Sequence, residues 1–88
     1  MDMIVTYVDP VLRFSLEADR HSGRTFVGIE VRNTTVEYTE WYEVDRVTFA
    51  RFEADPTRAH DMVRRAQRRE LDHLLLLPPG DDRGLADA

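Results

Sequence analysis

The sequence contains no cysteine and no lysine, and its longest apolar run is the four leucines at positions 74–77. Without cysteine, disulfide bonds and thiolate metal sites are excluded. Four apolar residues are far fewer than the ~20 that a membrane-spanning helix needs. The first residues are acidic rather than basic and lack the apolar core of a signal peptide, so we expect a cytoplasmic protein.

Recognisable catalytic and metal-binding motifs are also missing. The three histidines, His21, His60 and His73, do not form an i,i+4 metal pair, and no HExxH motif occurs. The glycines are isolated and form no phosphate-binding loop, and no serine stands in a nucleophile elbow. We therefore expect no metal, no cofactor and no catalytic residue, and we predict a non-enzymatic protein.

The chain has 88 residues, of which 42% are hydrophobic and 33% charged, with a net charge of −5. This composition is typical of one small globular domain. We place that domain at residues 1–77 and expect residues 78–88, which begin with Pro78 and Pro79, to be a flexible tail. So short a chain buries a thin core, and part of its apolar surface can require a partner.

The first two thirds of the chain have the composition of β-strands. Val, Ile, Phe, Tyr and Thr are enriched in five segments separated by turn residues, at 3–8, 11–18, 25–32, 36–44 and 47–54. A helix should follow, with Asp55 as its N-cap and Pro56 at its first position, and should end before Pro78. The predicted fold is α+β: a five-stranded antiparallel meander with one C-terminal helix packed on one face.

Cross-strand pairing defines the two faces of this sheet. Placing Ala18 opposite Thr25 pairs apolar residues on one face and sets Arg13 against Glu30 on the other. The same reasoning, applied with less support to the other strands, gives three further registers: Val5 opposite Phe14, Val31 opposite Val36, and Glu40 opposite Arg51. We expect the corner at Pro10 to be wider than a tight two-residue turn.

One face of the predicted sheet has an aromatic patch that no helix is left to cover. The registers gather Phe26, Trp41 and Phe52 there, and Leu75 and Leu76 of the leucine run should point away from the sheet. Exposed aromatic clusters often mark association surfaces. The leading hypothesis is therefore an interaction or accessory module that forms a homo-oligomer, a dimer joined through these five residues. The alternative is that a strand bulge moves Trp41 or Phe52 into the core, or that the tail folds over them.

A second hypothesis is a small-molecule-binding protein or enzyme. Glu40 lies mid-strand on the apolar face, where burial would raise the pKa of its carboxyl group and suit it to acid–base chemistry. An ion pair with Arg51 would make the same residue purely structural. If the space between sheet and helix is open, the pocket would be lined by Tyr38, Glu40, Tyr42, Arg51 and His73.

The third hypothesis is a nucleic-acid binder. Residues 64–69 contain the only basic cluster, formed by Arg64, Arg65, Arg68 and Arg69. Asp61 and Asp72 lie within about one turn and can neutralise it, and no aromatic residue for base stacking is interleaved. The acidic net charge also works against nucleic acid. A solvated, charge-compensated helix face is the better interpretation.

Overall fold

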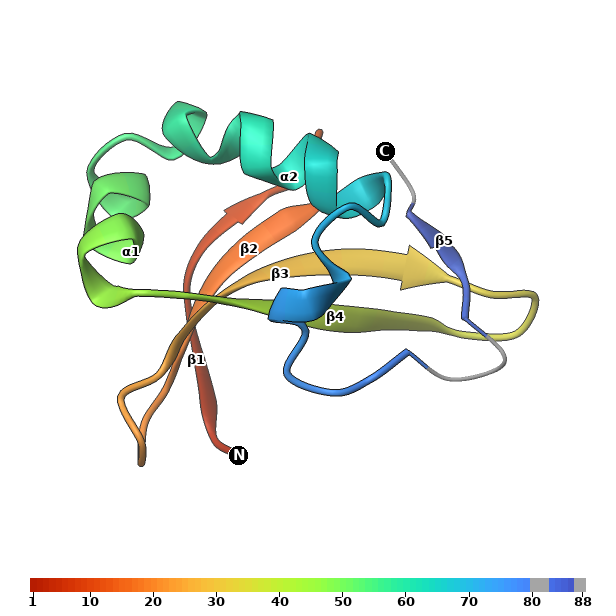
Figure 1. The fold of residues 1–88 in the computed structure, drawn as a ribbon, viewed down its shortest axis with the longest axis horizontal. Helices are drawn as coiled ribbons and strands as arrows, with labels where there is room; N and C mark the ends of the chain where they lie inside the picture. Colours follow the sequence, from red (N-terminus) through yellow and green to blue (C-terminus); the bar gives the residue numbers. More distant parts are fainter. Residues whose placement is uncertain (80–82, 87–88) are drawn as a thin grey trace.

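The structure, a computed structural model, describes residues 1–79 and 83–86. Four strands form an antiparallel meander in the order β1 (Met3–Asp9), β2 (Phe14–Asp19), β3 (Thr25–Arg32) and β4 (Glu37–Val44). The α1 and α2 helices lie on one side of this sheet (Figure 1). The predicted α+β class with an antiparallel sheet is confirmed, but the meander has four strands rather than five.

The remaining elements are short. They are α1 (Arg46–Ala54), the 3-10 helix η1 (Pro56–Ala59), α2 (His60–Gln67), the 3-10 helix η2 (Asp72–Leu74) and β5 (Leu85–Ala86). The two-residue β5 pairs with β3 beyond the point where the pairing of β2 ends at Ile29. The expected domain end at residue 77 stays a prediction, although Arg83 and Gly84 of the expected tail hydrogen-bond to β4 and β5 pairs with β3.

The prediction of a fifth strand at 47–54 is wrong, because this segment is helix α1. The carboxylate of Asp45 accepts a hydrogen bond of 2.7 Å from the backbone N–H of Thr48 and so caps the helix. Phe49 and Phe52, three residues apart, are both buried. In a strand this spacing would place the two rings on opposite faces, whereas a helix brings both to the core.

The prediction of one continuous C-terminal helix up to the leucine run is also wrong. Asp55 caps the helical segment and Pro56 begins it, as expected, but α2 ends at Gln67. Arg69 then adopts a left-handed backbone conformation with φ of 62°, and its N–H donates to the carbonyl of Ala66. This geometry is a common helix stop. The leucines at 74–77 therefore do not continue along the axis of α2.

The β2–β3 register is the predicted one, with Ala18 opposite Thr25 and Phe14 opposite Ile29. The Arg13 guanidinium also meets the carboxylate of Glu30, at 2.5 Å. This hairpin could be predicted because apolar and charged pairs on its two faces agree on one register.

The other two registers differ from the prediction because side chains shape their turns. Asp9 accepts hydrogen bonds from the N–H groups of Val11 and Leu12, which widens the corner at Pro10 and brings Asp9 itself opposite Phe14. Val5 then lies opposite Glu17, and a bulge follows it.

Between β3 and β4, the Asn33 side chain accepts from the N–H groups of Thr35 and Val36. Val31 consequently lies opposite Tyr38 rather than Val36, and Trp41 opposite Gly28. A shift of two residues keeps every side chain of β4 on its predicted face.

The hydrophobic core lies between the sheet and the helices. Phe14, Leu16, Val27, Ile29 and Tyr42 contribute the sheet side. The helical side consists of Phe49, Phe52, Ala59, Val63, Ala66 and Leu71. The opposite face of the sheet, here called the outer face, is bare of helices (Figure 1).

Candidate functional site

Glu40 and Arg83 form the most buried ion pair among the described residues. The Arg83 Nε and Nη2 atoms each donate a hydrogen bond of 2.9 Å to the Glu40 carboxylate, and both side chains are 9% exposed. The predicted partner Arg51 is exposed on α1 instead. That prediction is wrong because it required residues 47–54 to be a strand beside β4.

Arg83 also joins Glu40 to Asp72 and Tyr42. It donates hydrogen bonds of 2.8 and 2.9 Å to the Asp72 carboxylate, which holds the pKa of Asp72 below its ordinary value. Burial, together with the nearby Glu40 carboxylate, raises the pKa of Tyr42 to about 12. The phenol therefore stays neutral at pH 7, and one guanidinium is shared by two carboxylates, an arrangement typical of a structural ion-pair cluster.

Part of the predicted sheet–helix pocket is in contact with the segment that contains Arg83 and Gly84, and a ligand-binding role for its residues stays a prediction. Tyr38, Glu40 and Tyr42 do come together, but Arg83 lies against the last two, and the Gly84 N–H donates to the Tyr38 hydroxyl at 2.8 Å. His73 is exposed on η2. The sequence had no signal for Arg83, since a lone arginine in a polar segment resembles any solvated charge.

The predicted interface residues do not form one exposed patch. Phe52 is buried in the core, 8% exposed. Phe26 lies on the outer face, as predicted, but is fully buried, with the Arg24 guanidinium 5.5 Å above its ring. Trp41 is also on the outer face, where it is partly exposed and packs outside the main core.

Leu75 and Leu76 follow the edge of β4. Leu75 forms an isolated antiparallel bridge with Tyr42, and the Leu76 N–H donates to the carbonyl of Trp41 at 2.9 Å. The chain thereby covers the part of the β4 edge around Trp41 and Tyr42, where it pairs backbone groups that an edge strand otherwise leaves open. A role for Trp41, Leu75 or Leu76 in contacts with another molecule stays a prediction.

The opposite edge, along β1, is not covered in this way. Among the described residues, β1 pairs only with β2. Its apolar side chains are unusually open: Ile4 is 41% exposed, Val5 52% and Val8 60%. The strand contains no lysine, arginine or proline, the residues that commonly prevent edge-to-edge pairing. Sequence reasoning had placed Val5 on the core face through the wrong β1–β2 register.

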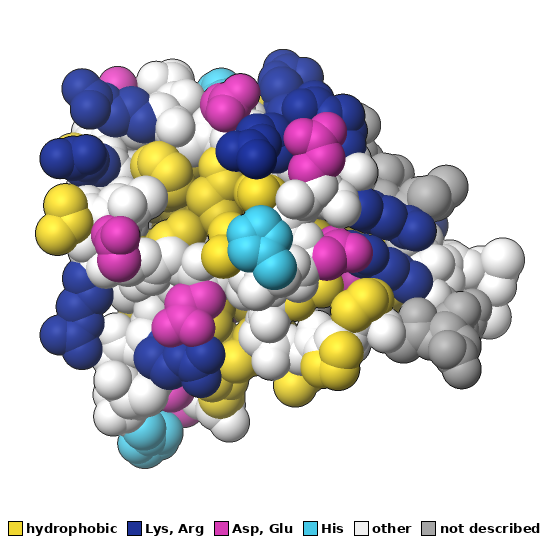
Figure 2. Space-filling view, viewed as in Figure 1, with side chains coloured by type: hydrophobic (Ala, Val, Ile, Leu, Met, Phe, Trp, Pro, Cys, Tyr) yellow, Lys and Arg dark blue, Asp and Glu magenta, His cyan; other side chains and the backbone are white. Residues whose placement is uncertain are grey.

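The positive charge of the basic cluster is partly neutralised by Glu70, which follows the cluster directly in the chain. Glu70 forms ion pairs with Arg65, at 3.6 Å, and with Arg68, at 2.6 Å. Arg69 donates to the carbonyl of Gly84. Figure 2 shows the basic side chains near the C-terminal end of α2 interspersed with acidic ones. Glu70, rather than the expected Asp61 and Asp72, makes the direct contacts.

No family model matches this chain. Comparison with curated proteins and with solved structures also finds no significant match. Within the described residues, no group of three or more potential ligands could hold a metal ion, and none of the helices has the length and apolar character needed to cross a membrane. Function must therefore be argued from the surface that this fold presents.

Proposed function

We propose that the protein is a non-enzymatic interaction or accessory module that pairs with a second copy of itself through the free edge of β1. The observation that carries this proposal is the contrast between the two edges of the sheet. Leu75 and Leu76 pair with the edge of β4, whereas β1 has solvent-exposed valines beside backbone groups that pair with no other strand among the described residues. We further propose a cytoplasmic location.

The chemistry of β1 favours a second copy over an unrelated partner. Asp9, at the end of the strand, is its one charged residue, so two antiparallel copies meet without a row of like charges. A two-fold axis perpendicular to the sheet keeps both outer faces on the same side, which brings Val5 and Val8 of the two copies together. Main-chain hydrogen bonds and valine burial would both contribute to association.

Sedimentation velocity at about 0.1 mM, above the dissociation constants of ordinary specific dimers, tests this proposal. We expect the wild type to sediment as a dimer and Val8→Lys as a monomer, because an edge lysine must be desolvated on pairing. Val47→Lys is the matched control, since Val47 is 64% exposed on α1 against 60% for Val8. A monomeric wild type, or a Val8→Lys protein that still dimerises, would overturn the proposal.

A further inference from the structure

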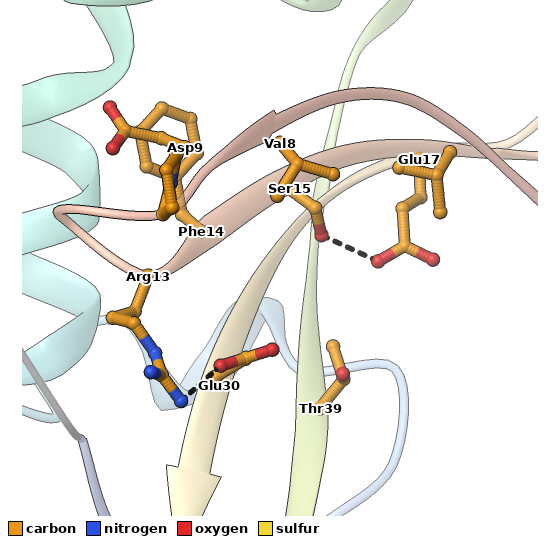
Figure 3. A pocket seen from close by; sticks show the side chains of 10 residues that line it. Val8, Asp9, Arg13, Phe14, Ser15, Glu17, Glu30 and Thr39 are labelled. Carbon is orange, nitrogen blue, oxygen red and sulfur yellow. Dashed lines mark hydrogen bonds and ion pairs between the residues drawn. The ribbon is translucent and has the colours of Figure 1, made fainter.

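A cavity of about 410 Å³ opens on the outer face of the sheet, away from the helices. Its walls include Val5 and Val8 of β1, Ser15 and Glu17 of β2, Glu30 of β3 and Thr39 of β4. Figure 3 shows the polar groups of Ser15, Glu17, Glu30 and Thr39 around the hollow, with the Arg13–Glu30 ion pair at one side. The volume is within the range of ordinary small-ligand sites, about 300–1,000 Å³.

Glu17 is the exceptional residue of this cavity. It is 6% exposed, and its carboxylate accepts a hydrogen bond of 2.6 Å from the Ser15 hydroxyl. Among the described residues no arginine or histidine forms an ion pair with it. The other glutamates of the outer face do have arginine partners: Glu30 pairs with Arg13, Glu37 with Arg32 and Glu43 with Arg24. Glu17 is thus the most buried carboxylate of the cavity, and the described residues give it no ion-pair partner.

Gly28 makes this arrangement possible. It lies in the interior of β3, directly opposite Ser15. A Cβ atom at this position would lie 2.5 Å from the Ser15 Oγ and 2.7 Å from the Glu17 Oε2. Glycine inside a strand commonly marks such a close approach. The side chains of Glu17 and Ser15 can therefore lie across β3 and form part of the cavity wall.

A buried carboxylate that lacks a counter-charge costs free energy, which a bound cation would recover. The cavity offers that cation the carboxylates of Glu17 and Asp9, hydroxyl groups on Ser15 and Thr39, and apolar walls from Val5 and Val8, while its third carboxylate, Glu30, is paired with Arg13. A metal ion fits poorly, since no cluster of three ligands exists within the described residues. An organic cation with a short aliphatic chain matches both the charge and the valines.

We propose that the outer-face cavity binds a small organic cation, an alkylammonium or alkylguanidinium group. Its charged end contacts Glu17 and Ser15, and its aliphatic chain packs against Val5 and Val8. The net charge of −5 favours the approach of such a ligand at low ionic strength. This site shares Val5 and Val8 with the self-association surface proposed above, but its charged end, Glu17 with Ser15, lies on β2 outside that surface.

A titration of ¹⁵N-labelled protein with n-butylguanidinium, followed by amide chemical shifts, tests the site. We expect saturable shifts at Ser15, Glu17, Gly28 and Thr39 with a dissociation constant of about 1 mM, the range that so few atoms allow. The neutral n-butanol, which has the same alkyl chain, should bind at least about tenfold more weakly, a difference equivalent to one charge-assisted hydrogen bond.

Two variants make the result decisive. Glu17→Gln keeps the shape of the side chain and should lower the affinity for n-butylguanidinium at least about tenfold. Glu53 is an exposed glutamate on α1, and Glu53→Gln should leave this affinity unchanged. Equal binding of the alcohol and the cation, no binding by the wild type at about 20 mM, or full binding by Glu17→Gln would each overturn the proposal. Glu17→Gln should still sediment like the wild type, so failure of either proposal is separable from failure of the other.

Discussion

The Glu40 carboxylate and the Arg83 guanidinium, 43 positions apart in the sequence, meet through two hydrogen bonds of 2.9 Å. Their contact ties the segment that contains Arg83 and β5 to the middle of β4. Because Arg83 also donates to Asp72 beyond the end of α2, one side chain connects three separate parts of the chain. The stability of the fold should depend on it.

Replacing Arg83 with alanine should lower the free energy of unfolding by about 3 kcal/mol, because it leaves the buried Glu40 carboxylate without its partner. Urea denaturation at pH 7 provides the measurement. Arg51→Ala is the control: Arg51 is exposed on α1, and its loss should change stability by no more than about 0.5 kcal/mol. Equal effects of the two substitutions would mean that the Glu40–Arg83 contact contributes nothing to stability.

Tyr42 should cause a loss of stability in alkaline solution. Burial raises its pKa to about 12, whereas the phenol of the unfolded chain titrates near 10. Because the native state favours the neutral phenol, its contribution is complete below about pH 10 and is lost as the pH rises towards 12. Urea denaturation between these limits should show a steeper decline for the wild type than for Tyr42→Phe. Identical slopes would contradict this explanation.

Gly28→Ala should destabilise the protein by about 2 kcal/mol, the usual cost of overpacking, because the new methyl group meets Ser15 and Glu17. Ser15→Ala removes the nearer of these contacts. The cost of Gly28→Ala should therefore be smaller in a Ser15→Ala background, which a double-mutant cycle by urea denaturation measures. A cost that is the same in both backgrounds would show that the close approach to Ser15 is not what requires glycine.

The parts of the fold that could be predicted are those with local and redundant signals. The β2–β3 register follows from several pairs that agree, among them Phe14 with Ile29 and Arg13 with Glu30. Helix α1 could not be predicted from propensity, since Val47, Thr48 and Phe49 favour strands. Its signals were the Asp45 cap and the spacing of Phe49 and Phe52, which become decisive only when both rings can reach the core.

The candidate site was harder to predict than the fold. Alternation along β2 predicts that Glu17 lies on the face opposite to Phe14 and Leu16, but its burial depends on Gly28 beneath it and on the strands beside it. Likewise, Val5 lies on the outer face because Asp9 shapes the turn that follows β1 and shifts the β1–β2 register. Pairing Val5 with Phe14 instead of Glu17 was enough to put this side chain on the wrong face of the sheet.

The sequence by itself determined the fold class, the two-faced sheet, the β2–β3 hairpin and the absence of disulfide and thiolate chemistry. These follow from composition and from alternation over a few residues. Only the tertiary structure decided that residues 47–54 are helical, that Arg83 rather than Arg51 neutralises Glu40, and that β1 rather than β4 is the open edge. Each of these depends on burial between segments distant in the chain, and that burial outweighs local propensities of at most about 1 kcal/mol per residue.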